Sequence, residues 1–396
     1  MDSIVIENLA TKKKSLRLAI VTETYPPEVN GVALSLSRFV EGLSQLNHEI
    51  QLVRPRQQGD AQQSSPGEIE EVLTTGLPIP KYPNLKVGLP AKKRLVSQWT
   101  IRRPDLVHIV TEGPLGWSAL EAAKKLKIPV SSDFRTNFHS YSQHYGIGWL
   151  KRPIVGYLRK FHNKTLLTTV PTERMRRELS SIGFRNVRVL SRGVNAMLYS
   201  PEKRSAALRA QWGVTDDHFT LVHVGRLAAE KNLALLIRAY GALRQKDDRV
   251  RLMMVGDGPE RAGLEERFPE VIFSGVRHDE DLATHYASAD LFVFPSLTET
   301  FGNVTLEAMA SALPVVAFDY AAAAQYVTAA SGCLAPLEND EAFVRGCETL
   351  HDCYRNDRKA YDAMRFESRE RALRESWPVV VEQFESMLLD VSRQVG

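Results

Sequence analysis

The sequence predicts an α/β protein of two domains, each built on a parallel sheet. The chain has 396 residues, which is more than one hydrophobic core usually organises, so two domains are expected. Short apolar runs of β type alternate along it with amphipathic helical patterns. That alternation is typical of parallel strands joined by crossover helices.

The first half begins the alternation with a strand at 18–22, a loop at 23–31 and a helix at about 32–46. Leu36, Phe39 and Leu43 recur at helical spacing in that last segment and predict its buried face. Further along, the same patterns predict a strand at 106–110, a helix ending at 125 and a strand from 129, with a loop at 57–68.

The second half restarts the pattern after an irregular segment, and we place the hinge between the domains at 193–202. Strands are predicted at 219–224, 251–255, 271–273, 291–294 and 314–317, and a final amphipathic helix at 377–395. The expected division is an N-terminal domain at 1–195, a C-terminal domain at 196–375 and a helix at 376–396 that packs back on the N-terminal domain.

Charge separates the two halves. Residues 1–200 hold 29 lysines and arginines against 16 acidic residues, a net +13, whereas the remainder holds 22 against 31, a net −9. Such a split suggests that the first half meets an anionic partner, such as a membrane surface or nucleic acid; a solvated surface with a chance bias in charge is the alternative. No recognised nucleic-acid motif accompanies the charge, so nucleic acid is not expected.

Composition predicts a cytoplasmic protein. No apolar run reaches the roughly 18 residues that span a bilayer, and residues 1–15 lack the apolar stretch of a secretory signal. The three cysteines lack metal-site spacing and suit a reducing compartment.

The strongest chemical signal is the segment 294–309, which predicts a buried strand, a loop with Gly302 and a helix capped by Asn303. The first turn of a helix points N–H groups at its ligand and favours an anion. Glu299 and Glu307, eight positions apart, would be repelled by a phosphate. We therefore expect each carboxylate to accept hydrogen bonds from sugar or ribose hydroxyls.

A second signal follows the strand at 219–224, where Gly225 precedes Arg226 and Lys231. Two cations beyond the carboxyl end of a strand suit a diphosphate, because open α/β sheets bind ligands at that edge. The third signal is Gly256-Asp257-Gly258, a tight turn after the next strand.

In this order, these motifs and the run Pro314-Val-Val-Ala317 resemble the retaining glycosyltransferases of family 4, which have the GT-B fold. The resemblance implies that Arg226 and Lys231 neutralise the diphosphate of a nucleotide-sugar donor. It also implies that Glu299 contacts the donor sugar and Glu307 the ribose. It places the remaining donor contacts at Gly31, Gly275, Val276, Phe301, Gly302, Asn303 and Val304.

One position departs from the family pattern. Arg135-Thr136 stands where many members have His-Thr, and that histidine contacts the donor sugar. Arg135 stays protonated and cannot act as a base, but it can bind the sugar or an anionic substituent. His139, four residues later, is the alternative for the role.

Within the family, the N-terminal half is similar to sulfoquinovosyl-diacylglycerol synthases and bacterial lipid mannosyltransferases. The expected function is metal-free, retaining transfer of a hexose, from GDP-mannose or a UDP-hexose, to a lipid-linked acceptor at the inner face of the plasma membrane. No cofactor is expected. The alternatives are transfer to a soluble anionic acceptor such as a sugar phosphate, a GT-B epimerase or phosphorylase, and a membrane-binding scaffold without activity.

The segment 149–164 interleaves bulky apolar side chains, among them Tyr157, with basic ones. Such a pattern is typical of a helix that lies on a membrane. An ordinary helix that packs its apolar side inward is the alternative.

Overall fold

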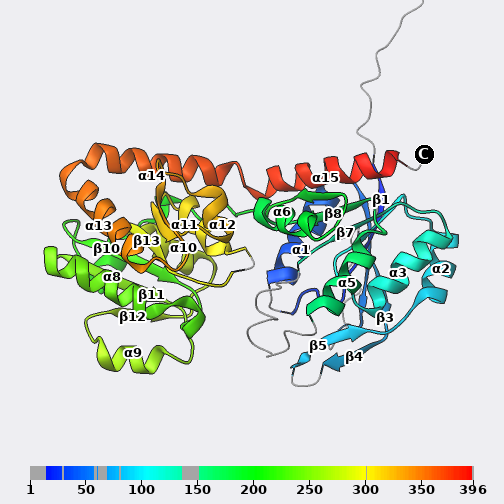
Figure 1. Cartoon of the computed structure of the whole chain (residues 1–396), viewed down its shortest axis with the longest axis horizontal. Helices are drawn as coiled ribbons and strands as arrows, with labels where there is room; N and C mark the ends of the chain where they lie inside the picture. Colours follow the sequence, from blue (N-terminus) through cyan, green and yellow to red (C-terminus); the bar gives the residue numbers. More distant parts are fainter. Residues whose placement is uncertain are drawn as a thin grey trace, which may run out of the picture.

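The computed structural model describes residues 15–28, 31–57, 60, 69–79, 82–135, 151–299 and 301–394. They form two lobes that lie side by side (Figure 1). The expected α/β architecture of two parallel sheets is confirmed. None of the helices in the described ranges combines the length and apolarity required to cross a membrane.

In the described part of the N-terminal domain, seven parallel strands form one sheet in the order β3-β2-β1-β6-β7-β8-β9. Its central strands, such as β6, are buried on both faces because helices cover them. The strands are β1 (Arg17–Val21), β2 (Glu49–Pro55), β3 (Ile69–Thr74), β6 (Leu106–Ile109), β7 (Val130–Asp133), β8 (Leu167–Val170) and β9 (Val187–Val189), with a hairpin of β4 (Gly76–Ile79) and β5 (Tyr82–Gly88). The helices are α1 (Gly31–Gln45), α2 (Lys92–Ile101), α3 (Pro114–Lys125), α5 (Lys151–His162) and α6 (Glu173–Ser181).

The C-terminal domain repeats the plan with six described parallel strands in the order β12-β11-β10-β13-β14-β15. The strands are β10 (Phe219–Val224), β11 (Val250–Val255), β12 (Ile272–Gly275), β13 (Leu291–Phe294), β14 (Val315–Phe318) and β15 (Gly332–Ala335). The helices are α7 (Ala206–Gln211), α8 (Leu233–Lys246), α9 (Arg261–Arg267), α10 (Asp279–Ser288), α11 (Asn303–Ala310), α12 (Ala321–Tyr326), α13 (Asp340–Asn356) and α14 (Arg358–Leu373), with single 3₁₀ turns η3 (Pro201–Lys203) and η4 (Ala229–Lys231).

The chain passes between the domains twice, and the two crossings lie against each other. Val194 N donates to Glu375 O (2.9 Å) and Trp377 N donates to Val194 O (3.2 Å). A Cβ on Gly193 would lie 2.5 Å from the Trp377 ring, so only glycine fits there. The hinge is therefore a pair of chain segments joined at one isolated backbone bridge.

The last helix, α15 (Trp377–Arg393), packs on the N-terminal domain although it follows the C-terminal one in sequence (Figure 1). Val380, Phe384 and Leu388 are buried in the same core cluster as Phe39 of α1. His48 Nε2 and Glu385 Oε1, 3.0 Å apart, form a buried polar contact between the helix and the domain. Because α15 directly follows the second crossing, its packing fixes that crossing to the N-terminal domain.

Candidate active site

Two interlocked glycine turns form the carboxyl edge of the C-terminal sheet. Gly256, after β11, has φ +140°, and a Cβ there would lie 1.9 Å from the carbonyl oxygen of Gly225. Leu227 N donates to Asp257 O (2.9 Å), which joins the two turns. The turns present bare backbone where ligands of open α/β sheets bind.

Arg226 extends from the first of these turns into solvent. Its side chain is 68% exposed, and its contact with Glu230 is long, at 3.9 Å. A surface pair of that kind contributes little stability. The guanidinium is therefore free to turn toward a phosphate.

Lys231 and Glu299 converge from different loops into one ion pair. Lys231 Nζ donates to Glu299 Oε1, and the two side chains are 15% and 16% exposed. Ser296 Oγ donates to the same carboxylate oxygen at 2.9 Å. Tyr320 OH donates to the backbone oxygen of Glu299 at 3.1 Å and steadies the loop. Lys231 must leave this pair, at least in part, to reach a diphosphate.

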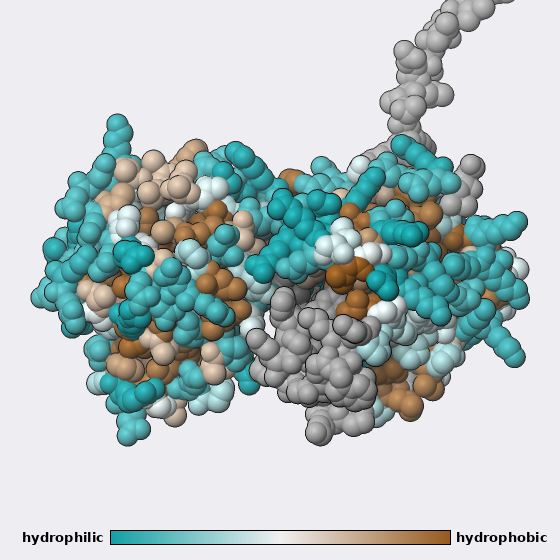
Figure 2. All heavy atoms as spheres, in the orientation of Figure 1, coloured by the Kyte–Doolittle hydropathy of each residue, from teal (hydrophilic) through white to brown (hydrophobic). Residues whose placement is uncertain are grey.

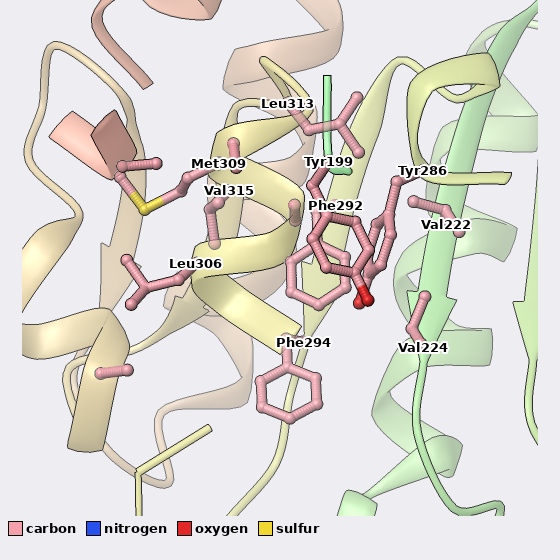
Figure 3. Packing of buried hydrophobic residues seen from close by; sticks show 14 of the residues in the cluster. Tyr199, Val222, Val224, Tyr286, Phe292, Phe294, Leu306, Met309, Leu313 and Val315 are labelled. Carbon is pink, nitrogen blue, oxygen red and sulfur yellow. The ribbon is translucent and has the colours of Figure 1, made fainter. Parts of the chain in front are cut away.

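Glu307 projects from α11 into an aromatic environment. Tyr286 OH donates to Glu307 Oε2 at 3.0 Å. The rings of Tyr199 and Tyr286 lie beside Phe292 between α11 and β10 (Figure 3). Burial raises the pKa of Glu307 to about 7. The carboxyl is thus positioned by one phenol and retains acceptor capacity for hydroxyl donors.

The start of α11 differs from the sequence prediction in one detail. Gly302 occupies the N-cap with φ +90°, so the prediction of Asn303 as the cap is wrong, because that left-handed backbone favours glycine. Among the described residues, no side chain caps the first turn. The N–H groups of Asn303 and Val304 therefore have no intrahelical acceptor and suit an anion. Phe301, only 1% exposed, anchors the loop ahead of them.

The remaining donor-site residues of this domain follow β12. Gly275 has φ +71°, and a Cβ there would lie 3.2 Å from Arg261 Nη1. Val276 is 54% exposed, as a residue that lines an open binding surface can be. The assignment of these two residues to the base of the donor stays a prediction.

Arg135 follows β7 at the carboxyl edge of the N-terminal sheet. Its Nε donates to Asp133, whose other carboxylate oxygen accepts a bond of 3.1 Å from Thr169 Oγ1. Arg135 Nη1 is buried and has no partner among the described residues. The position therefore provides a fixed cation. His139, the alternative, lies outside the described residues.

Arg192 is a candidate functional residue that no sequence motif identified. It follows β9 at the hinge and is 9% exposed. Its Cζ lies 5.6 Å from the centre of the Phe301 ring, and a Cβ on Gly31 would lie 3.1 Å from its Nη1. Its position after a strand at the carboxyl edge was the signal that could have identified it.

A groove of about 750 Å³ opens on the N-terminal domain. Its wall combines acidic, basic and hydroxyl groups with apolar side chains, which suits a ligand with a polar head and an apolar body. Its lining includes Glu23, Thr24, Val32, Thr111, Glu112, Arg135, Pro153, Ile154, Tyr157 and Leu158.

Glu23 is the buried acid of this groove and was also missed in the sequence. Leu115 N donates to its Oε1 at 3.0 Å, at the start of α3. A Cβ on Gly113 would lie 2.2 Å from the carboxylate, so the glycine makes room for it. Burial raises the pKa of Glu23 to about 7. It can accept hydrogen bonds from the hydroxyls of a ligand in the groove.

Comparison with known proteins gives the class of enzyme to which this two-lobed fold belongs. The description "Glycosyltransferase Family 4" matches residues 29–197, and "Glycosyl transferases group 1" matches residues 218–352. A GDP-mannose-dependent alpha-mannosyltransferase of Mycobacterium tuberculosis is 32% identical over 93% of this chain and 95% of that protein. The chain belongs to glycosyltransferase family 4.

Two further relatives have lipid-related names. The sulfoquinovosyl transferase SQD2 of Arabidopsis thaliana is 31% identical over 76% of this chain and 60% of that protein. The alpha-monoglucosyldiacylglycerol synthase of Streptococcus pneumoniae is 29% identical over 76% of this chain and 71% of that protein.

Solved structures confirm the expected GT-B fold. Anabaena HepE in complex with UDP superimposes with a TM-score of 0.74 at 20% identity, covering 94% of this chain and 100% of that one. The sucrose-phosphate synthase of Thermosynechococcus elongatus gives a TM-score of 0.72 at 18% identity, covering 96% of this chain and 99% of that one.

Proposed function

We propose that this glycosyltransferase moves a hexose from a nucleotide sugar, with GDP-mannose the favoured donor, to a lipid-linked acceptor. The proposal includes retained anomeric configuration and no requirement for a metal ion. The observation that carries it is the convergence of Lys231 and Glu299 beside the uncapped start of α11. The name of the mycobacterial relative supports the donor, and the diacylglycerol synthase supports a lipid acceptor.

The geometry assigns each group a task. When the bond from the anomeric carbon to the diphosphate breaks, negative charge grows on the leaving phosphate. Lys231, Arg226 and the first turn of α11 would stabilise that charge electrostatically. Glu299 would bind sugar hydroxyls and Glu307 the ribose, while the acceptor hydroxyl enters from the groove that contains Glu23.

The direct test is transfer activity. The protein is incubated with GDP-mannose, UDP-glucose or ADP-glucose together with a lipid extract, and the product is analysed by mass spectrometry and NMR. We expect an α-linked glycolipid, made at the same rate after EDTA treatment. Epimerised free donor without a glycolipid, or complete loss of activity with EDTA, would refute the proposal.

Charge and exposed apolar side chains support a membrane-facing N-terminal domain, which we place at the inner face of the plasma membrane in the cytoplasm. In α5, Leu158 and Phe161 pack inward, whereas Ile154 and Tyr157 remain 38% and 44% exposed. Hydrophobic surface gathers on the face of the domain that carries this helix (Figure 2). Each lysine or arginine near an anionic bilayer contributes about 1 kcal/mol.

We therefore expect the protein to sediment with anionic liposomes at low salt and to be released at high salt. Neutralising the four cations of α5 should abolish the binding, whereas neutralising four cations of the acidic domain should not. Protein that stays in the supernatant would favour a soluble anionic acceptor instead. The α5 variant changes Lys151, Arg152, Arg159 and Lys160 to glutamine, and the control changes Arg238, Lys246, Arg267 and Lys359.

A further inference from the structure

Among the described residues that interact around Arg192, where the two domains meet, cations outnumber carboxylates. Three cations lie there: Arg135 and Arg192 from the N-terminal domain and Lys231 from the C-terminal one. Two carboxylates interact with Arg192, those of Asp133 and Glu299. Each is already bonded elsewhere, Asp133 to Arg135 and Glu299 to Lys231. Among the described residues, Arg192 has no ion pair of its own.

Burial makes this imbalance costly. Arg192 is 9% exposed, and its Nε is buried without a hydrogen-bond partner among the described residues. Arg135 Nη1 is also buried without a hydrogen-bond partner among the described residues. Desolvation and the neighbouring Arg135 together lower the pKa of Arg192 to about 10. A buried cation without a partner destabilises a fold, so a ligand that supplies the missing charge is expected.

The position of Arg192 indicates where that ligand would bind. Its guanidinium borders Gly31 on one side and lies against the Phe301 ring on the other. These residues belong to the two opposing domains, at the glycine loop and at the start of α11. A group bound to Arg192 therefore contacts both domains at once. The planar guanidinium, with two N–H edges, matches the geometry of phosphate and carboxylate oxygens.

We propose that Arg192, assisted by Arg135, forms an oxyanion site between the domains. The site binds a phosphate or another acidic oxygen group carried by a substrate. Two sources share that chemistry: the distal phosphate of the nucleotide donor and an acidic head group on the acceptor. The proposal extends the proposed function by giving the chemical class of one substrate group.

The test compares the R192Q variant with the wild type. Glutamine keeps hydrogen-bonding capacity but removes the charge. The matched control is R188Q, four residues before Arg192 in the sequence. Arg188 is an exposed arginine that pairs with Asp390 at 3.3 Å. The R192K variant keeps the positive charge but lacks the two N–H edges of a guanidinium, so it should recover part of the phosphate affinity.

Calorimetric titration with inorganic phosphate and with GDP, at constant ionic strength, measures the site directly. We expect phosphate binding to weaken at least 10-fold in R192Q and to be unchanged in R188Q. A parallel loss for GDP identifies the nucleotide as the source. If the GDP affinity is unchanged, the acceptor is the source of the acidic group. In that case the KM of R192Q should rise at least 10-fold for an acidic glycolipid but not for neutral diacylglycerol.

Thermal unfolding separates this role from a structural one. Without anions, R192Q should melt at a higher temperature than the wild type, because an unpaired buried charge has been removed. A lower melting temperature with unchanged phosphate and GDP affinities would overturn the proposal. If the wild type transfers no sugar but phosphate binding still depends on Arg192, the proposed function fails and the oxyanion site stands.

Discussion

The K231A variant should lose a factor of about 10²–10³ in kcat, the usual effect of removing one group that stabilises charge in a transition state. Lys231 lies deep in the donor site, with its Nζ bonded to Glu299 and 5.3 Å from the centre of the Phe294 ring. Arg226, whose side chain is 68% exposed, is not part of this ion pair. Steady-state kinetics with saturating donor would measure the loss.

K203A is the control for this change. Lys203 forms an ion pair with Glu280 in the same domain, so its removal matches the chemical change without touching the donor site. Its kcat should stay within about twofold of the wild type, as for most exposed ion pairs. A K231A enzyme with full activity would exclude Lys231 from the reaction.

The E307Q variant should bind its donor about 10-fold to 100-fold more weakly and yet be more stable at pH 8. The first effect follows because a hydrogen bond to a charged group contributes about 1.5–3 kcal/mol. The second follows from burial, which raises the pKa of Glu307 to about 7, above that of an unfolded glutamate. The stability that the protonated carboxyl contributes is fully present below the unfolded pKa, near pH 4, and is lost as the pH rises to 7.

The neutral amide avoids that loss. Relative to the wild type, E307Q should gain about 1–3 kcal/mol at pH 8 and almost nothing at pH 4. E23Q is the matched control, because burial raises the pKa of Glu23 to about 7 in the other domain. It should show the same pH-dependent gain and unchanged donor affinity. Equal melting temperatures for E307Q and the wild type at pH 8 would contradict the explanation.

Sequence patterns located several of the strands that are buried on both faces, although not β2 or β8. The predicted ranges 219–224 and 291–294 coincide with β10 and β13, whose residues are all buried. The patterns missed β3, because its residues alternate in exposure and include Glu70 and Glu71. Periodicity identifies a strand only when one side of it, or both, is consistently apolar.

Sequence patterns identified the candidate-site residues that lie within contiguous motifs. They missed the residues that only the folded chain brings to the site. Arg226, Lys231, Glu299 and Glu307 lie in local patterns that the sequence displays. The pairing of Lys231 with Glu299 joins residues from separate loops, and no local pattern encodes it. Arg192 reaches the domain interface only through the hinge geometry, so its role required the three-dimensional structure.

The position of α15 has a consequence for biosynthesis. The strands of the N-terminal sheet end with β9, but α15, which fills the core beside Phe39, ends about 200 residues later. At about 5–20 residues per second, the ribosome needs roughly 10–40 s to deliver that helix. Until α15 is delivered, the nascent N-terminal domain exposes the apolar face that this helix will cover. By the time α15 is made, the described strands of the C-terminal domain have all been synthesised. The domain made first is therefore the one completed last.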